Sequence, residues 1–403
     1  MSERAGPLSG IRVLDLSRVL SGPFCTVCLG DLGAEVLKIE EPQKGDDTRA
    51  FGPPFVAGES TYFLSINRNK ASVAVNLKSP RGLALVKALA AKCDVVVENF
   101  RPGVAERLGL GPKALREQNP RLIYCAISGF GHQGVKAFEA KAGYDAILQG
   151  LSGLQHLTGQ SDGPPTRIGV PMSDLLTGMA AFQAILVALY ERERSGQGAF
   201  LDVAMLDATA QVLTFHAAAA LNAGKKPERL GNVHASIAPY ETFRASDGYL
   251  NVAVGNDEQF VAFSALLGHA EWAADPRFST NPKRVEHRAA LSPLIQAELS
   301  KAPMAAWVER LDAAGIPVGH IARVEEVVDH PQLKARGRVL EVQHPTAGPL
   351  KLLNTPLPQA RTEASAPPLL GEHTRPVLEA VLGLSAAEVS ALAADGVIRL
   401  GGA

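Results

Sequence analysis

Asp174 is the side chain of this sequence that is best placed to do covalent chemistry. It closes a loop rich in proline and glycine, and the apolar run from Leu175 to about Arg192 predicts a long helix after it. A carboxylate in the first turn of a helix lies at the positive end of the helix dipole, which favours the anionic form. An anionic carboxylate is a nucleophile toward activated acyl groups. The same pattern also fits an ordinary N-cap, for which aspartate is a preferred residue.

Two further polar segments are candidates for ligand contacts. Residues 99–103, Asn-Phe-Arg-Pro-Gly, directly follow an apolar β-rich run, and open α/β sheets bind ligands at that edge. With Arg107 shortly after it, this segment also fits a turn followed by a solvated helix. His234 and Ser236 lie in a polar loop that begins at a glycine. Such a loop fits either a lid over a site or a linker between domains.

Motifs for nucleotide and metal chemistry are incomplete. Residues 129–134 match G-x-G-x-x-G, but that pattern binds dinucleotides in the first βα turn, where it opens a helix. The first βα turn expected here, residues 17–23, has a single glycine, so NAD binding is not expected. Cys25 and Cys28 form a C-x-x-C pair without a second pair or a histidine cluster. We therefore expect free thiols, no metal site and a reducing, cytoplasmic setting.

Composition excludes several classes of partner. The 403 residues are 46% hydrophobic and 20% charged, with a formal net charge of -1. This balance gives no electrostatic reason to expect nucleic acid or an anionic membrane. The first residues lack the apolar core of a signal peptide. The longest apolar stretch, near residues 179–190, is interrupted and short for a bilayer, so we expect a buried helix.

The order of the expected elements predicts a mixed α/β protein. Short β-rich runs alternate with helical runs over about the first 130 residues, which indicates βαβ units with parallel strands. We therefore expect a doubly wound, Rossmann-like α/β domain. The expected strands of that domain are residues 11–16, 35–40, 72–77, 94–98 and 122–127.

Changes in composition divide the chain into four segments. Residues 1–222 are expected to form the large α/β domain, which carries Asp174. The polar residues 223–232 are expected to form a linker, and residues 233–330 a smaller α+β domain that begins with a hairpin. Residues 331–403 are expected to return to the large domain.

Taken together, these features resemble the class III CoA-transferases, the superfamily of formyl-CoA transferase and carnitine CoA-transferase. The resemblance extends over nearly the whole chain. It implies the interlocked homodimer of that family, in which the two chains thread each other as rings. The motifs that carry it, in order, are residues 8–16, 30–40, 45–49, 97–103, 143–145 and 367–374.

The resemblance implies covalent catalysis, because Asp174 falls where the family carries its catalytic aspartate. That carboxylate attacks the donor thioester, which gives a mixed anhydride and CoA thiolate. The thiolate then forms an aspartyl-CoA thioester, and an acceptor carboxylate repeats the steps in reverse. Each step exchanges groups of similar energy, so neither a metal nor a bound prosthetic group is expected. Coenzyme A enters as a substrate.

The resemblance also assigns CoA contacts position by position, and its basic positions suit the CoA phosphates. Two departures stand out. Glu41 occupies the place of an arginine of the formyl-CoA transferases, and Leu20 the place of their active-site glutamine. The expected CoA contacts are Arg18, Ser21, Val75, Lys78, Asn99, Phe100, Arg101 and Arg107.

The residue type at position 144, tyrosine in this sequence, distinguishes two branches of the superfamily. The similar 2-methylacyl-CoA racemases carry histidine there, paired with the aspartate as two acid–base groups. Tyrosine, with a reference pKa of about 10, is a poor base near neutral pH. A racemase or epimerase is therefore the alternative function, and Tyr144 is expected to contact the acyl group of a transferase substrate. A non-catalytic CoA-binding protein is a second alternative, which the presence of Asp174 disfavours.

The smaller domain is similar to that of the succinyl-CoA:glutarate CoA-transferases. The resemblance implies succinyl-CoA as the donor and a dicarboxylate such as glutarate as the acceptor. Succinate, malate, itaconate and substituted succinates stay open as acceptors. His234 and Ser236 are expected to bind the distal carboxylate. The similar segments are residues 234–240, 247–249, 254–256, 259–260 and 344–348.

Overall fold

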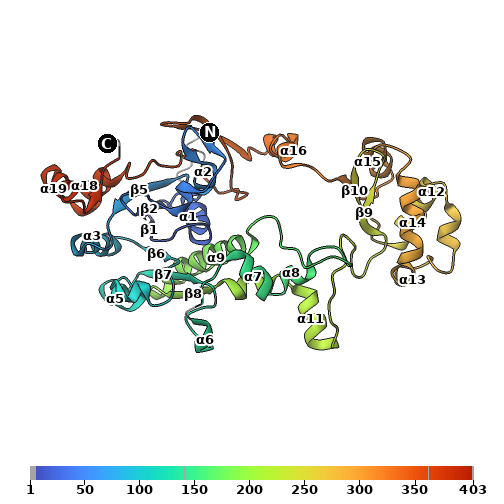
Figure 1. Ribbon diagram of the computed structural model, residues 1–403, viewed down its shortest axis with the longest axis horizontal. Helices are drawn as coiled ribbons and strands as arrows, with labels where there is room; N and C mark the ends of the chain where they lie inside the picture. The colour runs from blue at the N-terminus through green and yellow to red at the C-terminus, as the bar shows by residue number, and fades with distance from the viewer. Residues whose placement is uncertain (1–5, 140, 362, 402–403) are drawn as a thin grey trace. The chain divides into compact units, whose positions relative to one another are not determined.

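The computed structural model divides into two compact units (Figure 1). It describes residues 6–139, 141–361 and 363–401. The larger unit comprises Met1–Leu154, Ile168–Ala217 and Pro331–Ala403, and the smaller unit comprises Gln155–Arg167 and Ala218–His330.

A seven-stranded sheet organises the larger unit, in the order β14-β5-β2-β1-β6-β7-β8. All neighbouring strands are parallel except β14, which pairs antiparallel with β5. The chain adds strands on one side of β1 and then on the other, so the loops after β1 and β6 are neighbours at the carboxyl edge. The strands are β1 (Arg12–Asp15), β2 (Glu35–Glu40), β5 (Lys70–Val75), β6 (Val95–Glu98), β7 (Ile123–Ser128), β8 (Phe200–Ala204) and β14 (Ile398–Arg399).

Helices cover both faces of this sheet. Alternate strand residues point to opposite faces, so Val13 joins one core cluster and Leu14 the other. The cluster with Val13 contains side chains of α1 (Ser21–Asp31) and α9 (Met172–Ser195). The cluster with Leu14 contains side chains of α3 (Pro80–Ala90), α5 (Pro112–Gln118), α18 (Thr374–Leu382) and α19 (Ala386–Ala394). This is the mixed α/β architecture with a parallel sheet that the sequence predicted.

Shorter elements complete the larger unit and the segments next to it. A two-stranded hairpin of β12 (Val339–His344) and β13 (Gly348–Leu353) precedes the C-terminal helices. The others are η1 (Asp47–Ala50), β3 (Phe55–Val56), β4 (Glu59–Ser60), α2 (Thr61–Ile66), α4 (Val104–Arg107), α6 (Lys136–Glu139), α7 (Asp145–Leu151), α8 (Leu154–Leu157), α10 (Met205–Gln211), α11 (Thr214–Ala223) and α17 (Pro331–Ala335).

The smaller unit has its own core around a three-stranded sheet of order β11-β10-β9. Residues 155–167, which the sequence analysis placed in the large domain, group with this unit. Arg229 donates hydrogen bonds to the carbonyls of His156 and Gly163, which ties that segment down. The elements are β9 (Tyr240–Arg244), β10 (Tyr249–Ala253), β11 (Val318–His320), α12 (Asp257–Leu266), η2 (Ala270–Ala274), α13 (Asn281–Glu286), α14 (Arg288–Leu299), α15 (Met304–Ala313) and α16 (Val324–Val328).

Helix α9 is longer than the sequence predicted. It runs from Met172 to Ser195, so its length and composition alone would allow it to cross a membrane, a test that core helices of soluble proteins also pass. One face of α9, with Phe182, Ile185 and Leu189, packs in the core of the larger unit. All four cysteines are free thiols; Cys25, Cys93 and Cys125 are buried, and Cys28 is partly buried.

Candidate active site

Asp174 lies inside the first turn of α9, and it is not the N-cap. The helix begins at Met172 and its N-cap is Pro171, which has no side-chain hydrogen bond to offer. The capping acceptor comes from another helix, because the backbone N–H of Ser173 donates to Oδ1 of Asp145 at 2.8 Å. The N-cap interpretation of Asp174 is therefore wrong, and its carboxyl group is available for other contacts.

Gln149 holds Asp145 in place. Its side-chain amide donates to Oδ2 of Asp145 at 2.9 Å and to the carbonyl of Val170 at 3.3 Å. Its side-chain oxygen accepts the N–H of Ile168 at 2.8 Å. Gln149 is fully buried, so these bonds fix α7 against the segment that leads into α9.

Burial and a neighbouring carboxylate change the acidity of Asp174. Loss of solvent raises its pKa most, and the negative charge of Asp145 raises it further. A hydrogen bond from Ser21 acts in the opposite direction, and the resulting pKa is about 7. The helix dipole that suggested a stable anion contributes only about 0.3–1 kcal/mol, less than one pKa unit. In the free protein, Asp174 is therefore close to half-protonated at neutral pH.

A glycine lets Ser21 reach Asp174. Ser21 is the first residue of α1, and α1 packs against α9. A Cβ atom on Gly178, one turn after Asp174, would lie 2.6 Å from the carbonyl oxygen of Ser21 and 3.0 Å from the ring of Phe24. The absent side chain thus permits the close approach of the two helices that brings Ser21 to the carboxyl group.

A cavity of about 170 Å³ opens beside Asp174 at the carboxyl edge of the sheet. It is bordered by the loops after β1, β6 and β7 and by the start of α7, and Leu20 also lines it. Tyr144 is 66% exposed and forms part of its rim. The predicted site residues that this cavity brings together are Arg18, Ser21, Asn99, Phe100, Arg101, Tyr144 and Asp174.

A second cavity of about 300 Å³ adjoins the first, since Arg18 and Phe100 line both. It contains two more of the predicted contacts, Val75 and Lys78. Lys44 adds a further positive charge, while Glu41, Glu40, Asp46 and Asp47 add negative charges. The two cavities share Arg18 and Phe100, and Arg101 lines the first cavity while Lys44 and Lys78 line the second. Adjoining cavities with these basic side chains can accommodate a long, phosphorylated ligand whose reactive end lies at Asp174.

Comparison with known proteins identifies the family. A sequence model described as CoA-transferase family III matches residues 8–374. The chain belongs to CoA-transferase family III. It is 45% identical to a mouse protein named succinyl-CoA:glutarate CoA-transferase, over 98% of this chain and 90% of that protein. The human protein of the same name is 42% identical, over 97% and 90% of the two chains. A crystal structure of a CAIB/BAIF family protein from Brucella suis superposes with a TM-score of 0.85 at 41% identity, over 93% of this chain and 99% of that one.

Several of the residues predicted to contact CoA in this transferase have other partners. The side-chain amide of Asn99 accepts the N–H of Arg18 at 2.9 Å and donates to its carbonyl at 2.7 Å. Asn99 therefore holds the loop after β1. The guanidinium group of Arg18 forms an ion pair with Asp47, with 3.2 Å between Nη1 and Oδ2. Arg107 is exposed and lines neither cavity, with its Nη1 close to Gly103.

His234 and Ser236, the predicted acceptor-binding residues, lie in the smaller unit. The ring of His234 stacks on Tyr240 with 5.1 Å between ring centroids. Its Nδ1 accepts the backbone N–H of Ser236 at 3.1 Å. These contacts order the loop locally, and the role of the two side chains stays a prediction.

Sequence reasoning missed Asp145 and Tyr62. Asp145 was within reach, because it directly follows Tyr144 in one of the family motifs. Tyr62, on α2, had no signal in the sequence. It lines neither cavity, but burial first and then the negative charges of Asp174 and Asp145 raise the pKa of its hydroxyl group to about 12. Within the described residues, no group of three or more His, Cys, Asp or Glu side chains is arranged to hold a metal ion.

Proposed function

We propose that this CoA-transferase moves CoA from succinyl-CoA to glutarate or a closely related dicarboxylate. The observation that carries the proposal is the position of Asp174, which lines one of two adjoining cavities that share the basic side chain of Arg18. The choice of substrates is supported by the names of the mouse and human relatives.

In the proposed reaction, the Asp174 carboxylate attacks the thioester carbonyl of succinyl-CoA. The C–S bond breaks, CoA leaves as the thiolate, and a mixed anhydride of Asp174 and succinate remains. The thiolate then attacks the aspartyl carbonyl and displaces succinate, which gives an aspartyl-CoA thioester. A glutarate carboxylate attacks the aspartyl carbonyl and displaces CoA thiolate, which gives a mixed anhydride of Asp174 and glutarate. The thiolate then attacks the glutaryl carbonyl, which forms glutaryl-CoA and releases the Asp174 carboxylate. Bonds and charges balance at every step without another reactant.

The surroundings of Asp174 suit both halves of this cycle. A carboxyl group with a pKa of about 7 is a stronger base than an ordinary aspartate and hence a better nucleophile when ionised. Arg18, Lys44 and Lys78 offer positive charge to the phosphates and Tyr144 borders the acyl end. We assign the distal carboxylate of the acceptor to His234 and Ser236, as the resemblance implied.

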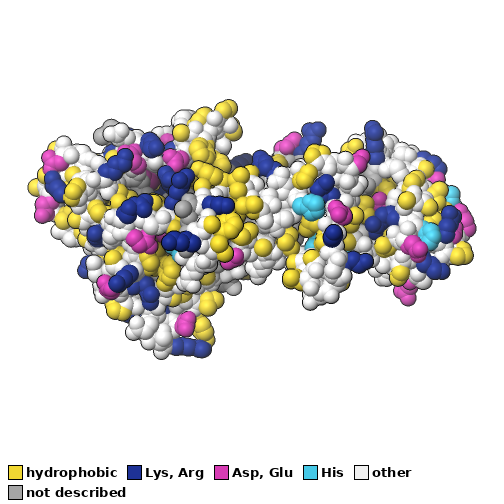
Figure 2. Space-filling model, turned by 60° about the horizontal axis from the view of Figure 1, so that its bottom comes forward, with side chains coloured by type: hydrophobic (Ala, Val, Ile, Leu, Met, Phe, Trp, Pro, Cys, Tyr) yellow, Lys and Arg dark blue, Asp and Glu magenta, His cyan; other side chains and the backbone are white. Residues whose placement is uncertain are grey.

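We further propose that the active protein is a homodimer, interlocked as in the resembled family, and that it works in the cytoplasm. Support for an assembly comes from the surface of the larger unit. Figure 2 shows hydrophobic side chains gathered on the face of the molecule that is turned toward the viewer. Exposed apolar residues of α7 and α9, two helices that pack together, include Ile147, Leu151, Met179, Val187 and Tyr190. An apolar face of this kind is typical of a protein interface.

Mass spectrometry after incubation with succinyl-CoA and then hydroxylamine tests the proposal. We expect a hydroxamate at Asp174 in the wild-type protein and none in Asp174→Asn, which has the same shape but no nucleophile. Transfer to glutarate should be lost in the same variant. An unmodified wild-type protein that incorporates solvent deuterium at the α-carbon of a 2-methylacyl-CoA would instead identify a racemase and contradict the proposal.

A further inference from the structure

The loop after β1 carries two predicted site residues, Arg18 and Ser21, and the side chains of four residues bind its backbone. Each main-chain polar group from the Ser17 N–H to the Val19 N–H is paired. Asn99 binds both groups of Arg18. The carboxylate of Asp15 accepts the N–H of Ser17 at 3.0 Å, from the end of β1 itself. The loop has no regular secondary structure, so these side chains replace it as the source of rigidity.

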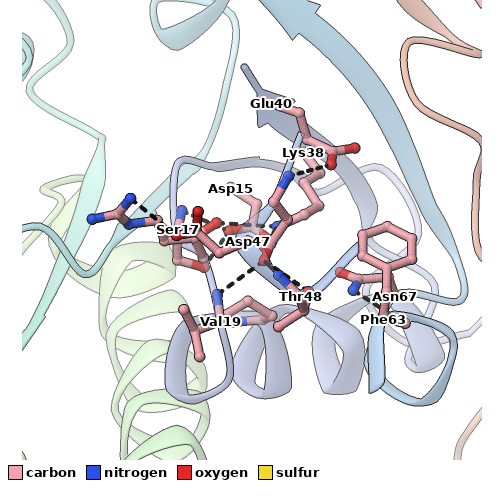
Figure 3. Close-up of polar contacts among 12 residues, drawn as sticks. Asp15, Ser17, Val19, Lys38, Glu40, Asp47, Thr48, Phe63 and Asn67 are labelled. Atoms are coloured by element: carbon pink, nitrogen blue, oxygen red, sulfur yellow. Dashed lines mark hydrogen bonds and ion pairs between the residues drawn. The ribbon is translucent and has the colours of Figure 1, made fainter. Parts of the chain in front are cut away.

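The remaining bonds come from a buried ion pair (Figure 3). Nζ of Lys38, on β2, lies 2.7 Å from Oδ2 of Asp46, and each side chain is only 1% exposed. Lys38 donates a second hydrogen bond to the carbonyl of Ser17 at 3.1 Å. Asp46 accepts the N–H of Val19 through Oδ1 at 3.3 Å. One ion pair thus contacts the loop on both sides of Arg18.

The backbone of the loop is strained at the point where Asp46 binds it. Val19 has φ of 67°, in the left-handed region that β-branched residues rarely adopt. Such a conformation is unfavourable and persists only where its surroundings impose it. Beyond Val19, the chain enters α1 at Ser21, which binds Asp174. The strained residue therefore sets the direction in which Ser21 approaches the carboxyl group.

The ion pair is itself anchored to the wall of the second cavity. The N–H of Asp46 donates to Oε2 of Glu40 at 2.9 Å, and Glu40 also binds Arg49 through both carboxylate oxygens. Lys38, Glu40 and Asp46 all line that cavity. Buried ion pairs add little net stability compared with apolar residues of the same size, so stability alone is a weak reason for this arrangement.

We propose that the buried Lys38–Asp46 pair is a positioning unit, which holds the Ser17–Val19 backbone in its left-handed turn and so places Arg18 for the CoA donor and Ser21 for Asp174. The inference rests on the proposed CoA transfer. Neither Lys38 nor Asp46 is assigned a chemical step: both act through the loop.

The test compares Asp46→Asn with a matched loss of a buried ion pair elsewhere. Asp31, near the end of α1, pairs with Arg68 at similar burial and lines neither cavity. In Asp46→Asn, the NH2 group of the new amide must face another donor in either orientation, Nζ of Lys38 or the N–H of Val19, so the loop must shift. We expect both Asp46→Asn and Asp31→Asn to lower Tm. The Kd of CoA, measured by titration calorimetry, should rise on the order of tenfold in Asp46→Asn and stay within twofold in Asp31→Asn.

Val19→Gly gives a second test when it is combined with Asp46→Asn. Glycine adopts the left-handed conformation without strain, so the turn can form in the double variant Val19→Gly/Asp46→Asn without the ion pair to impose it. We expect the double variant to recover part of the CoA affinity that Asp46→Asn loses. Equal CoA affinity of the Asp46 and Asp31 variants, or no recovery in the double variant, would overturn the inference. A wild-type protein that binds CoA without transferring it would refute the proposed function. The Kd values of CoA for the Asp46→Asn and Asp31→Asn variants would still test the positioning role of the ion pair.

Discussion

The Asp174 carboxyl group combines two properties that burial produces together: a raised pKa and a cost to stability. A carboxyl group whose pKa is raised by folding binds its proton more tightly in the folded protein than in the unfolded chain. The stability that this protonated carboxyl group contributes to the folded protein is therefore complete below the unfolded pKa of about 4. It is lost as the pH rises through about 7. The ionised Asp174 thus destabilises the folded protein, while the same raised pKa makes the carboxylate a better nucleophile.

Replacing this carboxylate should stabilise the protein while abolishing transfer. The amide of Asp174→Asn cannot ionise, so the variant avoids the penalty that the wild-type protein pays above pH 7. At pH 8 we expect its free energy of unfolding to exceed that of the wild-type protein by about 1–3 kcal/mol, which raises Tm by a few degrees. The difference in Tm should close toward pH 4. Thermal denaturation of both proteins across this range measures the gap. A gap that does not change with pH would contradict the assignment of the raised pKa to Asp174.

Asp145 and Ser21 should move the pH dependence of catalysis in opposite directions. Because the nucleophile must be ionised, kcat/KM of the wild-type protein should rise with pH around a midpoint of about 7. Asp145→Asn removes a like charge, so the midpoint should move to lower pH. Ser21→Ala removes the hydrogen bond that lowers the pKa of Asp174, so the midpoint should move to higher pH. Shifts of the same sign would contradict one of these two assignments.

The sequence predicted the residues of the site better than their roles. Asp174 was singled out by its position before a helix, Tyr144 by one of the family motifs, and Arg18 and Ser21 by the resemblance. These four residues line one cavity, and their roles stay predictions. The second role of Asn99, as a clamp on Arg18, depends on the pairing of β1 with β6 and could not be read from spacing. A pKa of about 7 also depends on burial and on Asp145, which only the folded chain brings to Asp174.

At the scale of elements, the site depends on how closely α1 and α9 approach. A methyl group at Gly178 would lie 2.6 Å from the carbonyl oxygen of Ser21, so Gly178→Ala must push the two helices apart. We expect a loss of about 1–3 kcal/mol of stability and a reduced kcat, because Ser21 moves away from Asp174. Denaturant unfolding and steady-state kinetics measure the two effects separately.

Gly30→Ala is the matched control for this prediction. Gly30 lies at the other end of α1, where a Cβ atom would be 3.0 Å from the carbonyl oxygen of Asn69. The substitution creates a similar crowding far from the cavities, so stability should fall while kcat stays near wild type. An equal loss of kcat in both variants would mean that α1 matters to the site through stability alone.

The elements themselves were largely within reach of the sequence. The alternation of β-rich and helical runs predicted the parallel strands β1, β2, β5, β6 and β7, because each is a short apolar run between turn residues. The start of α9 was missed, since the group that caps it is Asp145 on another helix. The association of residues 155–167 with the smaller unit was missed as well, because bonds from Arg229, distant in sequence, hold them there.

At the scale of the whole molecule, the exposed face of α7 and α9 is the strongest reason to expect a second chain. Val187 is 65% exposed and Tyr190 62% exposed on the side of α9 that does not pack in the core. A permanent dimer interface usually buries more than about 2,000 Å² and is rich in such residues. The same helix therefore connects the site, at its first turn, with the proposed interface, farther along.

A single charge on this face should prevent the chains from assembling. Val187→Asp places a carboxylate where the proposed partner packs, and burying it unpaired would cost several kcal/mol, whereas an isolated exposed position tolerates it. Because interlocked chains can pair only as they fold, we expect sedimentation velocity after refolding from denaturant to show a dimer for the wild-type protein and a monomer for Val187→Asp. Val261→Asp, on α12 of the smaller unit and 55% exposed, should remain dimeric. A wild-type protein that sediments as a monomer at micromolar concentration would refute the proposed assembly. If Val187→Asp is monomeric and its CoA affinity and kcat are unchanged, then the site is complete within one chain and the dimer serves stability rather than chemistry.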